Sequence, residues 1–180
     1  MALRPSPFPS PITLSEADAP RVASLYERCA DYFLLQDGAA PSLADARELF
    51  TDVPPGKEPR DQIVLGWRRG GDLDAIAAIL RNYPRDGIWY LGFMIVDPGL
   101  RGRDLGRSIY AAVEELAAAG GATEIRLAVL EANEAGERFW RSLGFSEVRR
   151  VGPDRFKLRK HWRVELSRHI DSGICGGESR

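Results

Sequence analysis

The stretch WYLGFMIVDPGLRGRDLG, residues 89–106, organises the rest of this 180-residue chain. Residues 88–96 are an unbroken apolar run, rich in strand-forming residues and too short for an independent helix, which predicts a buried β-strand. Asp97, Pro98 and Gly99 end that strand, because proline has no N–H for the ladder and glycine permits a positive φ. Apolar residues then recur at helical spacing, which predicts a helix through Leu105, Ile109, Val113 and Leu116.

The turn between this strand and this helix has the composition of an anion-binding site. A glycine-rich backbone entering a helix exposes unpaired N–H groups beside the positive end of the helix dipole. Three arginines and one aspartate lie within residues 101–107, a net charge of +2 (3 − 1). Glycine-rich turns are also common as plain tight connections, so this pattern alone leaves both interpretations open. A nucleotide P-loop sequence and the glycine spacing of dinucleotide-binding folds are both absent.

A family resemblance distinguishes between these interpretations. The turn is similar to the coenzyme A signature of the GCN5-related N-acetyltransferases (the GNAT family) in the spacing of Val96, Pro98, Arg101, Asp104 and Gly106. Residues 133–145, NEAGERFWRSLGF, resemble that family's N-x-x-A-x-x-h-[YW]-x-x-x-G-F segment. The resemblance covers roughly residues 12–170 and is strongest over residues 89–145.

The resemblance implies a single-domain α/β fold, with a mixed, mostly antiparallel sheet of about six to seven strands flanked by about four helices. It also implies direct transfer of an acetyl group from acetyl-CoA to a primary amine of a small molecule or a peptide N-terminus, without a covalent enzyme intermediate. The backbone of Met94, with that of Val96, is expected to stabilise the developing charge on the carbonyl oxygen. The residues expected to bind the co-substrate are Met94, Ile95, Val96, Arg101, Gly102, Arg103, Asp104, Leu105, Gly106, Arg107, Asn133, Phe139 and Trp140.

Two residues depart from the family pattern. Asp104 stands where the family usually has glycine, so its carboxylate either turns outward or weakens co-substrate affinity; the neighbouring arginines favour the outward orientation. Trp140 stands where many members have a tyrosine that protonates the leaving thiolate, and an indole N–H is far too weak an acid for that role. These departures keep a second hypothesis open, a non-catalytic acyl-CoA-binding module or sensor.

The general base is the least defined part of the predicted site. No carboxylate lies on the central strand, residues 88–96. Glu131, at the end of the next predicted strand, is the first candidate, although a solvated surface role fits it as well. The other candidates are Tyr90, Tyr32 and Asp86, and both histidines, His161 and His169, are expected to have structural or surface roles.

The acceptor pocket is expected to be lined by four aromatic residues: Tyr32, Phe33, Trp89 and Tyr90. Aromatic walls beside Asp31 and Asp37 would suit an ammonium group or an aromatic amine. Phe33 could equally belong to the hydrophobic core.

Composition sets the remaining expectations. The length fits one domain, and the net charge of −1 gives no sign of a nucleic acid or membrane partner. Two distant cysteines make neither a disulfide framework nor a metal site, and no apolar run of 18 residues is present. We therefore expect a cytoplasmic enzyme, a monomer or homodimer, that uses acetyl-CoA as co-substrate and no metal.

The chain is divided as follows on pattern alone. Residues 1–11 are expected to form an irregular arm, residues 12–170 the domain and residues 171–180 a disordered tail. Before the central strand, the pattern predicts a helix over 13–29, a loop over 31–40, a short helix from Ser42, a loop over 51–60, and a hairpin of strands 62–68 and 73–81. After the central strand and its helix, it predicts a strand over 124–130 and a helix from Asn133. A closing hairpin of strands 145–151 and 156–166, with its turn at 152–154, ends the domain.

Overall fold

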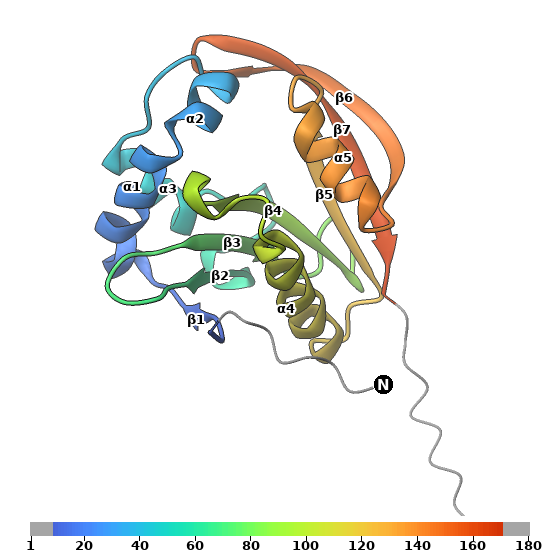
Figure 1. Ribbon diagram of the computed structural model, residues 1–180. Helices are drawn as coiled ribbons and strands as arrows, with labels where there is room; N and C mark the ends of the chain where they lie inside the picture. The colour runs from blue at the N-terminus through green and yellow to red at the C-terminus, as the bar shows by residue number, and fades with distance from the viewer. Residues whose placement is uncertain (1–8, 171–180) are drawn as a thin grey trace, which may run out of the picture.

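An open seven-stranded sheet runs through the molecule in the order β1-β2-β3-β4-β5-β7-β6 (Figure 1). The computed structural model describes residues 9–170, so most of the predicted arm and the whole predicted tail lie outside the described residues. Neighbouring strands pair antiparallel except β4 and β5, which confirms the expected mixed, mostly antiparallel sheet. The strands are β1 (Ile12–Thr13), β2 (Gln62–Trp67), β3 (Ala75–Leu80), β4 (Ile88–Val96), β5 (Glu124–Leu130), β6 (Ser146–Phe156) and β7 (Arg159–His169).

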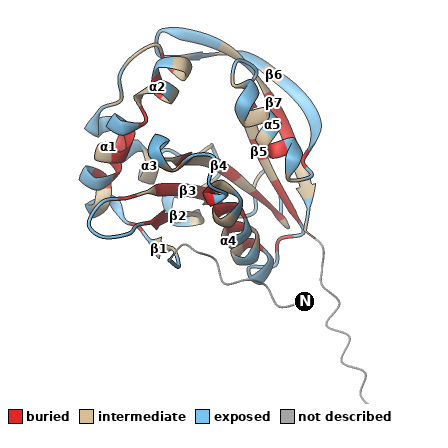
Figure 2. Ribbon diagram, viewed as in Figure 1, coloured by how far each residue is buried: buried red, intermediate tan, exposed pale blue. Residues whose placement is uncertain are grey.

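Helices cover both faces of the sheet. One face carries α1 (Ala19–Arg28), α2 (Ala30–Gln36) and α3 (Leu43–Thr51), and the other carries α4 (Leu105–Ala119) and α5 (Glu134–Ser142). Alternate residues of β3 enter the two hydrophobic cores, which explains why this AIAAIL segment is buried throughout and forms a strand (Figure 2). Short 3₁₀ turns complete the described elements: η1 (Glu16–Asp18), η2 (Pro59–Asp61) and η3 (Pro98–Leu100).

Two sequence predictions near the N-terminus were wrong. The helix expected over residues 13–29 begins only at Ala19, because Ile12 and Thr13 pair with β2 as an edge strand. The loop expected over residues 31–40 contains α2. Packing stabilises this short helix, since the Phe33 ring is buried 4.6 Å from the Tyr26 ring, between centroids.

The closing hairpin also turns later along the chain than predicted. Its strands reach Phe156 and Arg159, so the turn lies at Lys157 and Leu158. Gly152, at φ +122°, and Pro153 instead occupy an irregularity inside β6, where the missing proline N–H is tolerated. The longer hairpin reaches across the molecule to α2, where the Leu158 N–H donates to the Asp37 carbonyl at 3.0 Å (Figure 1).

Candidate active site

The opening between β4 and β5 defines the candidate site. These two strands pair only from Ile88 to Leu91 of β4, and beyond that point they diverge (Figure 1). A register shift against β3 leaves Gly92 as an extra residue, a β-bulge, where the divergence begins. Because parallel ladder bonds stop there, the later part of β4 has backbone groups on the β5 side that do not pair with β5.

The register identifies which β4 backbone groups face the opening. The Asp97 N–H donates to the Asp74 carbonyl at 2.9 Å, so that antiparallel pair is hydrogen-bonded. Residues of an antiparallel strand alternate in direction, so the N–H and C=O of Val96 and Met94 point away from β3 and toward the opening. This is the arrangement expected for Met94 as a backbone group of the site.

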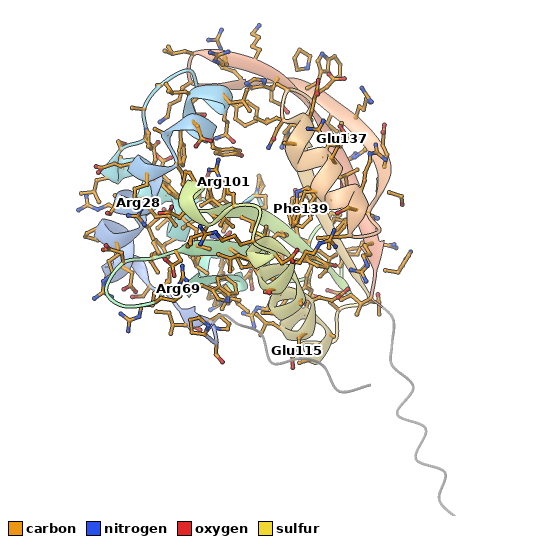
Figure 3. All side chains as sticks on the ribbon, viewed as in Figure 1. Arg28, Arg69, Arg101, Glu115, Glu137 and Phe139 are labelled. Atoms are coloured by element: carbon orange, nitrogen blue, oxygen red, sulfur yellow. The ribbon has the colours of Figure 1, made fainter. Side chains whose placement is uncertain are left out.

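A cavity of about 600 Å³ extends along this opening. It lies between the end of β4, the turn into α4, the start of α5 and α2. Figure 3 shows Arg101 on the α2 side and Phe139 on the α5 side. Its lining includes most of the predicted co-substrate residues: Met94, Ile95, Val96, Arg101, Gly102, Asp104, Gly106, Arg107, Asn133, Phe139 and Trp140.

The start of α4 supplies backbone donors to this cavity. The first bond of the helix runs from the Ser108 N–H to the Asp104 carbonyl at 3.1 Å, so the N–H groups of Leu105, Gly106 and Arg107 have no partner within the helix. A Cβ on Gly106 would lie 3.1 Å from the Phe139 ring, so glycine keeps this wall open. Leu105 itself is a core residue, 1% exposed, and contributes only its backbone.

Arg101 is oriented differently from the sequence expectation. Its guanidinium donates to both carboxylate oxygens of Asp31, at 2.5 and 3.2 Å, and to the Val96 carbonyl at 3.0 Å. These hydrogen bonds lower the pKa of Asp31 and raise that of Arg101. Arg101 therefore joins the turn to α2 and is already neutralised by a carboxylate.

The other charged residues of the turn point outward or to the side. The Asp104 side chain is 88% exposed, with Oδ1 3.9 Å from Arg107 Nε, which agrees with the expected outward orientation. Asp104 itself has φ +59°, a left-handed conformation at the start of α4. Arg107 lines the cavity and donates to Ser142 Oγ at 2.9 Å, whereas Arg103 is exposed and lies outside the lining.

A smaller cavity of about 170 Å³ adjoins the first at the bulge. The two share four lining residues: Tyr32, Met94, Asn133 and Trp140. The remaining walls of the small cavity come from α2, β4, β5 and the β6–β7 hairpin: Gln36, Tyr90, Leu91, Gly92, Phe93, Leu127, Ala128, Val129, Leu130, Phe156 and Arg163.

The residues at the junction are held by α5. Asn133 caps this helix by accepting from the Gly136 N–H at 3.0 Å. A Cβ on Gly136 would lie 2.6 Å from Asn133 Nδ2, which explains glycine where the family pattern has alanine. The Trp140 indole is buried and packs edge-on against Phe139 at 4.8 Å and Phe145 at 5.5 Å.

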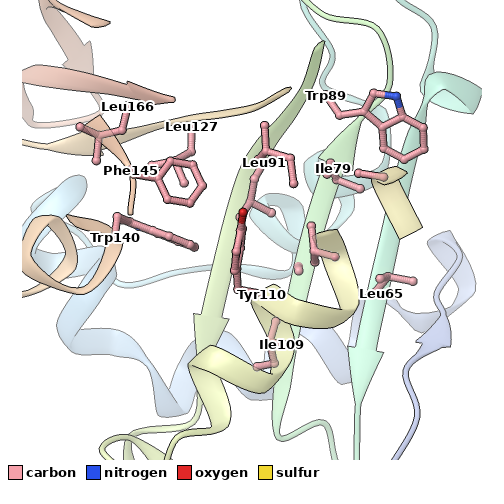
Figure 4. Close-up of a cluster of buried hydrophobic side chains, with 14 of the residues drawn as sticks. Leu65, Ile79, Trp89, Leu91, Ile109, Tyr110, Leu127, Trp140, Phe145 and Leu166 are labelled. Atoms are coloured by element: carbon pink, nitrogen blue, oxygen red, sulfur yellow. The ribbon is translucent and has the colours of Figure 1, made fainter. Parts of the chain in front are cut away.

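Two of the four predicted acceptor-pocket residues belong to the core instead. Trp89 is 3% exposed and packs under α4, where Gly120 leaves space for its ring (Figure 4). Phe33 is buried with Tyr26 and Phe93 on the other face. Tyr32 and Tyr90 do line the small cavity.

The acidic residues expected beside the acceptor are engaged elsewhere. Asp31 binds Arg101 in the large cavity, and Asp37 is buried 3.7 Å from Lys157 Nζ. His161 has the structural role expected of it, since its Nε2 lies 3.1 and 3.0 Å from the Leu35 and Gln36 carbonyls at the end of α2. His169 is an exposed strand residue.

The candidates for the general base also lie away from the opening or have unsuitable pKa values. Glu131 forms an ion pair with Arg150 and lines neither cavity, and Asp86 is exposed on a loop outside both. Burial raises the pKa of Tyr32 and of Tyr90 to about 12, so both phenols are protonated near neutral pH. The Tyr32 hydroxyl donates to Gln36 Oε1 at 2.8 Å.

Arg163, Gln36 and Phe156 are site residues that the sequence analysis missed. They come from β7, α2 and β6, and they converge only because the long hairpin reaches α2. The strand alternation of residues 156–166 was readable, but the pairing of Leu130 with Arg163 that brings β7 beside the opening is a long-range contact. Within residues 9–170, no helix has the length and apolar character needed to cross a membrane, and no three His, Cys, Asp or Glu side chains are grouped to hold a metal ion.

Comparison with known proteins identifies the family. The sequence profile described as "Acetyltransferase (GNAT) family" matches residues 21–145, more than half of the chain. This protein therefore belongs to the GNAT family of acetyltransferases. No curated protein sequence matches the chain.

Solved structures share the fold at low sequence identity. An acetyltransferase from Thermus thermophilus superposes with a TM-score of 0.72 at 21% identity, covering 89% of this chain and 96% of that one. An N-acetyltransferase from Staphylococcus aureus gives 0.68 at 11%, covering 89% and 98%. The ribosomal-protein-S18-alanine N-acetyltransferase from Escherichia coli gives 0.66 at 16%, covering 95% and 98%.

Proposed function

We propose that this chain is an acetyl-CoA-dependent N-acetyltransferase that acts on a primary amine of a small molecule or of a peptide N-terminus. The observation that carries the proposal is the meeting of two cavities where β4 turns the backbone of Met94 toward the opening. One cavity has the donors for a long anionic molecule, and the other has room for a compact acceptor.

The large cavity fits the co-substrate on several observations. The free N–H groups at the start of a 15-residue helix form an anion site, and Gly106 keeps side-chain atoms away from it. Arg107 adds a positive charge that faces a hydroxyl, whereas the charge of Arg101 is matched by Asp31. Acetyl-CoA, when bound, supplies an acetyl group activated as a thioester.

The residues at the junction would perform three tasks. The Met94 N–H faces the opening and can donate to a carbonyl oxygen that gains charge during transfer. Trp140 and Phe139 exclude water from this point. Asn133, fixed by its bond to Gly136, places an amide group where both cavities meet.

The acceptor amine must be neutral to attack, and its proton loss is favoured by the surroundings rather than by a carboxylate. No Asp or Glu is among the described residues that line the small cavity. An apolar wall and a nearby guanidinium both disfavour an ammonium ion, which lowers the pKa of a bound amine. The proposal assigns no base role to Glu131.

Two measurements test the function. Isothermal titration with acetyl-CoA should give saturable binding, and a panel of primary amines should contain members that release free thiol. Binding without turnover on any amine would favour the alternative, a non-catalytic acyl-CoA-binding module or sensor, which the indole at position 140 supports. The cytoplasmic location stays a prediction, as does the choice between monomer and homodimer.

A further inference from the structure

The charge in the small cavity is of one sign. Of the fifteen described residues that line it, Arg163 is the only one that carries a formal charge. The other polar side chains there are neutral, two phenols and two amides: Tyr32, Tyr90, Gln36 and Asn133. A second ammonium group would meet no carboxylate among these lining residues, whereas an anion would share the Arg163 guanidinium with Asp154, which lies outside the lining.

The Arg163 guanidinium does not use all of its hydrogen-bond donors within the described residues. Its Nε and Nη2 both donate to one oxygen, Asp154 Oδ2, at 3.1 and 2.5 Å. Within residues 9–170 the structure gives Nη1 no partner atom. The Arg163 and Asp154 side chains are 36% and 45% exposed, so solvent screens the attraction between them. An incoming carboxylate can therefore bind this guanidinium without first displacing a buried partner.

The position of Arg163 is fixed by the hairpin that closes the cavity. It lies opposite Leu130 of β5, and its guanidinium carbon lies 5.9 Å from the centroid of the Phe156 ring. The tip of the same hairpin is held to α2 through His161 and Leu158. The guanidinium is thus held on the cavity wall contributed by the hairpin, and Met94 lines the junction with the large cavity.

We propose that the acceptor is a compact amino carboxylate, whose carboxylate binds Arg163 while its amine lies at the Met94 junction. This inference rests on the proposed function and narrows its substrate class. It excludes polyamines and other polycations as preferred acceptors, and it reverses the sequence expectation of an ammonium site beside Asp31 and Asp37. Guanidinium and carboxylate match in geometry, which makes arginine selective for this group.

The test compares matched acceptors by thiol release. Each of several α-amino acids is assayed beside its own carboxamide, which has the same size and no negative charge, and beside 1,3-diaminopropane. Rates are corrected for the fraction of free amine, because the amide and the acid differ in amine pKa. The wild-type kcat/KM should be at least about 10-fold higher for the acids.

Three variants assign that preference to Arg163. Arg163→Gln should reduce the acid-to-amide ratio to about 2 or less, mainly through KM for the acid. Arg163→Lys should keep part of the ratio, and Asp154→Asn should increase it, because the guanidinium loses its competing carboxylate. Affinity for acetyl-CoA should be unchanged in all three, which separates a specificity role from misfolding.

Each outcome has one meaning. Equal wild-type rates on acid and amide, a preference for the diamine, or a ratio that survives Arg163→Gln would overturn the inference and leave acetyl transfer intact. If no amine is acetylated, the proposed function fails, and calorimetry of N-acetylated amino acids on the CoA-saturated protein decides the inference instead. Binding that Arg163→Gln abolishes would support an anion site, and equal binding of the matched carboxamides would refute it.

Discussion

The two cavities that meet at Met94 are built from different parts of the chain and with different chemistry. Half of the described residues that line the large one come from one continuous segment, β4 with its turn and the start of α4, and this segment offers backbone N–H groups. The small one is assembled from side chains of α2, β4, β5, β6 and β7. The first is suited to a ligand common to a whole family, and the second to a ligand particular to this chain.

This difference has a consequence for mutation. A backbone site is damaged by adding atoms near it and is less sensitive to exchanging side chains that point away. A site built from side chains is more sensitive to the exchange of those side chains.

Gly106→Val should have the largest effect on the backbone side. The new side chain would start 3.1 Å from Phe139 and extend into the large cavity. We expect acetyl-CoA affinity to fall by roughly 100-fold, about 2.7 kcal/mol, with the fold retained. Titration calorimetry measures the affinity, and circular dichroism checks the fold.

The matched control is Gly71→Val, on the hairpin between β2 and β3. No atom lies within 4 Å of a Cβ placed there, and its φ is outside the left-handed range. Its acetyl-CoA affinity should equal that of the wild type. A folded Gly106→Val protein with normal affinity would show that the anion site lies elsewhere.

Two arginines of the turn should differ in importance. Among the described residues, the Arg107 guanidinium has a hydroxyl and a distant carboxylate as partners, whereas Arg101 is held by Asp31. We expect Arg107→Gln to weaken acetyl-CoA binding about 5-fold, with a loss that shrinks as salt is added, and Arg101→Gln to weaken it less than about 2-fold. A stronger effect at position 101 would mean that Arg101 leaves Asp31 when the ligand binds.

The same contrast explains what the sequence could predict. Strand, turn and helix from residue 88 onward follow from local patterns: an apolar run, a Pro-Gly stop and helical spacing. Most of the described residues that line the large cavity lie in two segments, residues 94–107 and 133–140, so the two family motifs find most of them. The motif still placed Arg101 on the ligand, because its partner Asp31 is 70 residues away.

Most residues of the small cavity could not be predicted from the sequence, for a physical reason. Its walls depend on where the closing hairpin turns. The sequence pattern predicts this turn at residues 152–154, whereas Gly152 and Pro153 form an irregularity inside β6. With the turn at Lys157, the hairpin reaches α2 and carries Arg163 to the cavity. Trp89 and Tyr90 are adjacent strand residues that point to opposite faces, so alternation allows only one of them in the pocket but does not say which one.

Tyr90→Phe tests the acceptor side without changing charge. Burial, with a smaller contribution from Glu165, raises the pKa of this phenol to about 12, so the group stays protonated throughout the working range. We expect kcat/KM to fall about 3-fold, because phenylalanine cannot form a hydrogen bond with the acceptor. We also expect kcat/KM still to rise with pH as the acceptor amine loses its proton. A variant whose profile loses that rise would make Tyr90 part of the proton pathway.

Asp31→Asn should have a smaller effect, on stability in acid. The pKa of Asp31 is lowered, so the carboxylate contributes stability above its unfolded pKa of about 3.9, and that contribution disappears as pH falls through the lower folded value. The side chain is 59% exposed, so we expect only a few tenths of a kcal/mol at pH 7. Urea unfolding at pH 7 and pH 3 should show a smaller wild-type advantage at pH 3 than at pH 7.

Asp104, in the large cavity, is a residue at which this chain departs from the family pattern. Its left-handed φ of +59° is a conformation that glycine adopts without strain, and its side chain is 88% exposed. The structure gives its side chain no hydrogen bond that caps α4. The carboxylate therefore lies beside Arg107 and is open to solvent, at the edge of the large cavity that Asp104 helps to line.

Asp104→Gly should have the smallest effect on affinity. An exposed carboxylate is screened by water and salt, so acetyl-CoA binding should change by less than about 2-fold at both low and high salt. Stability should rise by up to about 1 kcal/mol, because glycine removes the left-handed strain, partly offset by the added freedom of the unfolded chain. Asp104→Asn is the matched control, since it removes the charge and tolerates the same backbone conformation. A large, salt-sensitive gain in affinity in both variants would show that the carboxylate faces the ligand, and it would strengthen the case for a weak-binding sensor over an enzyme.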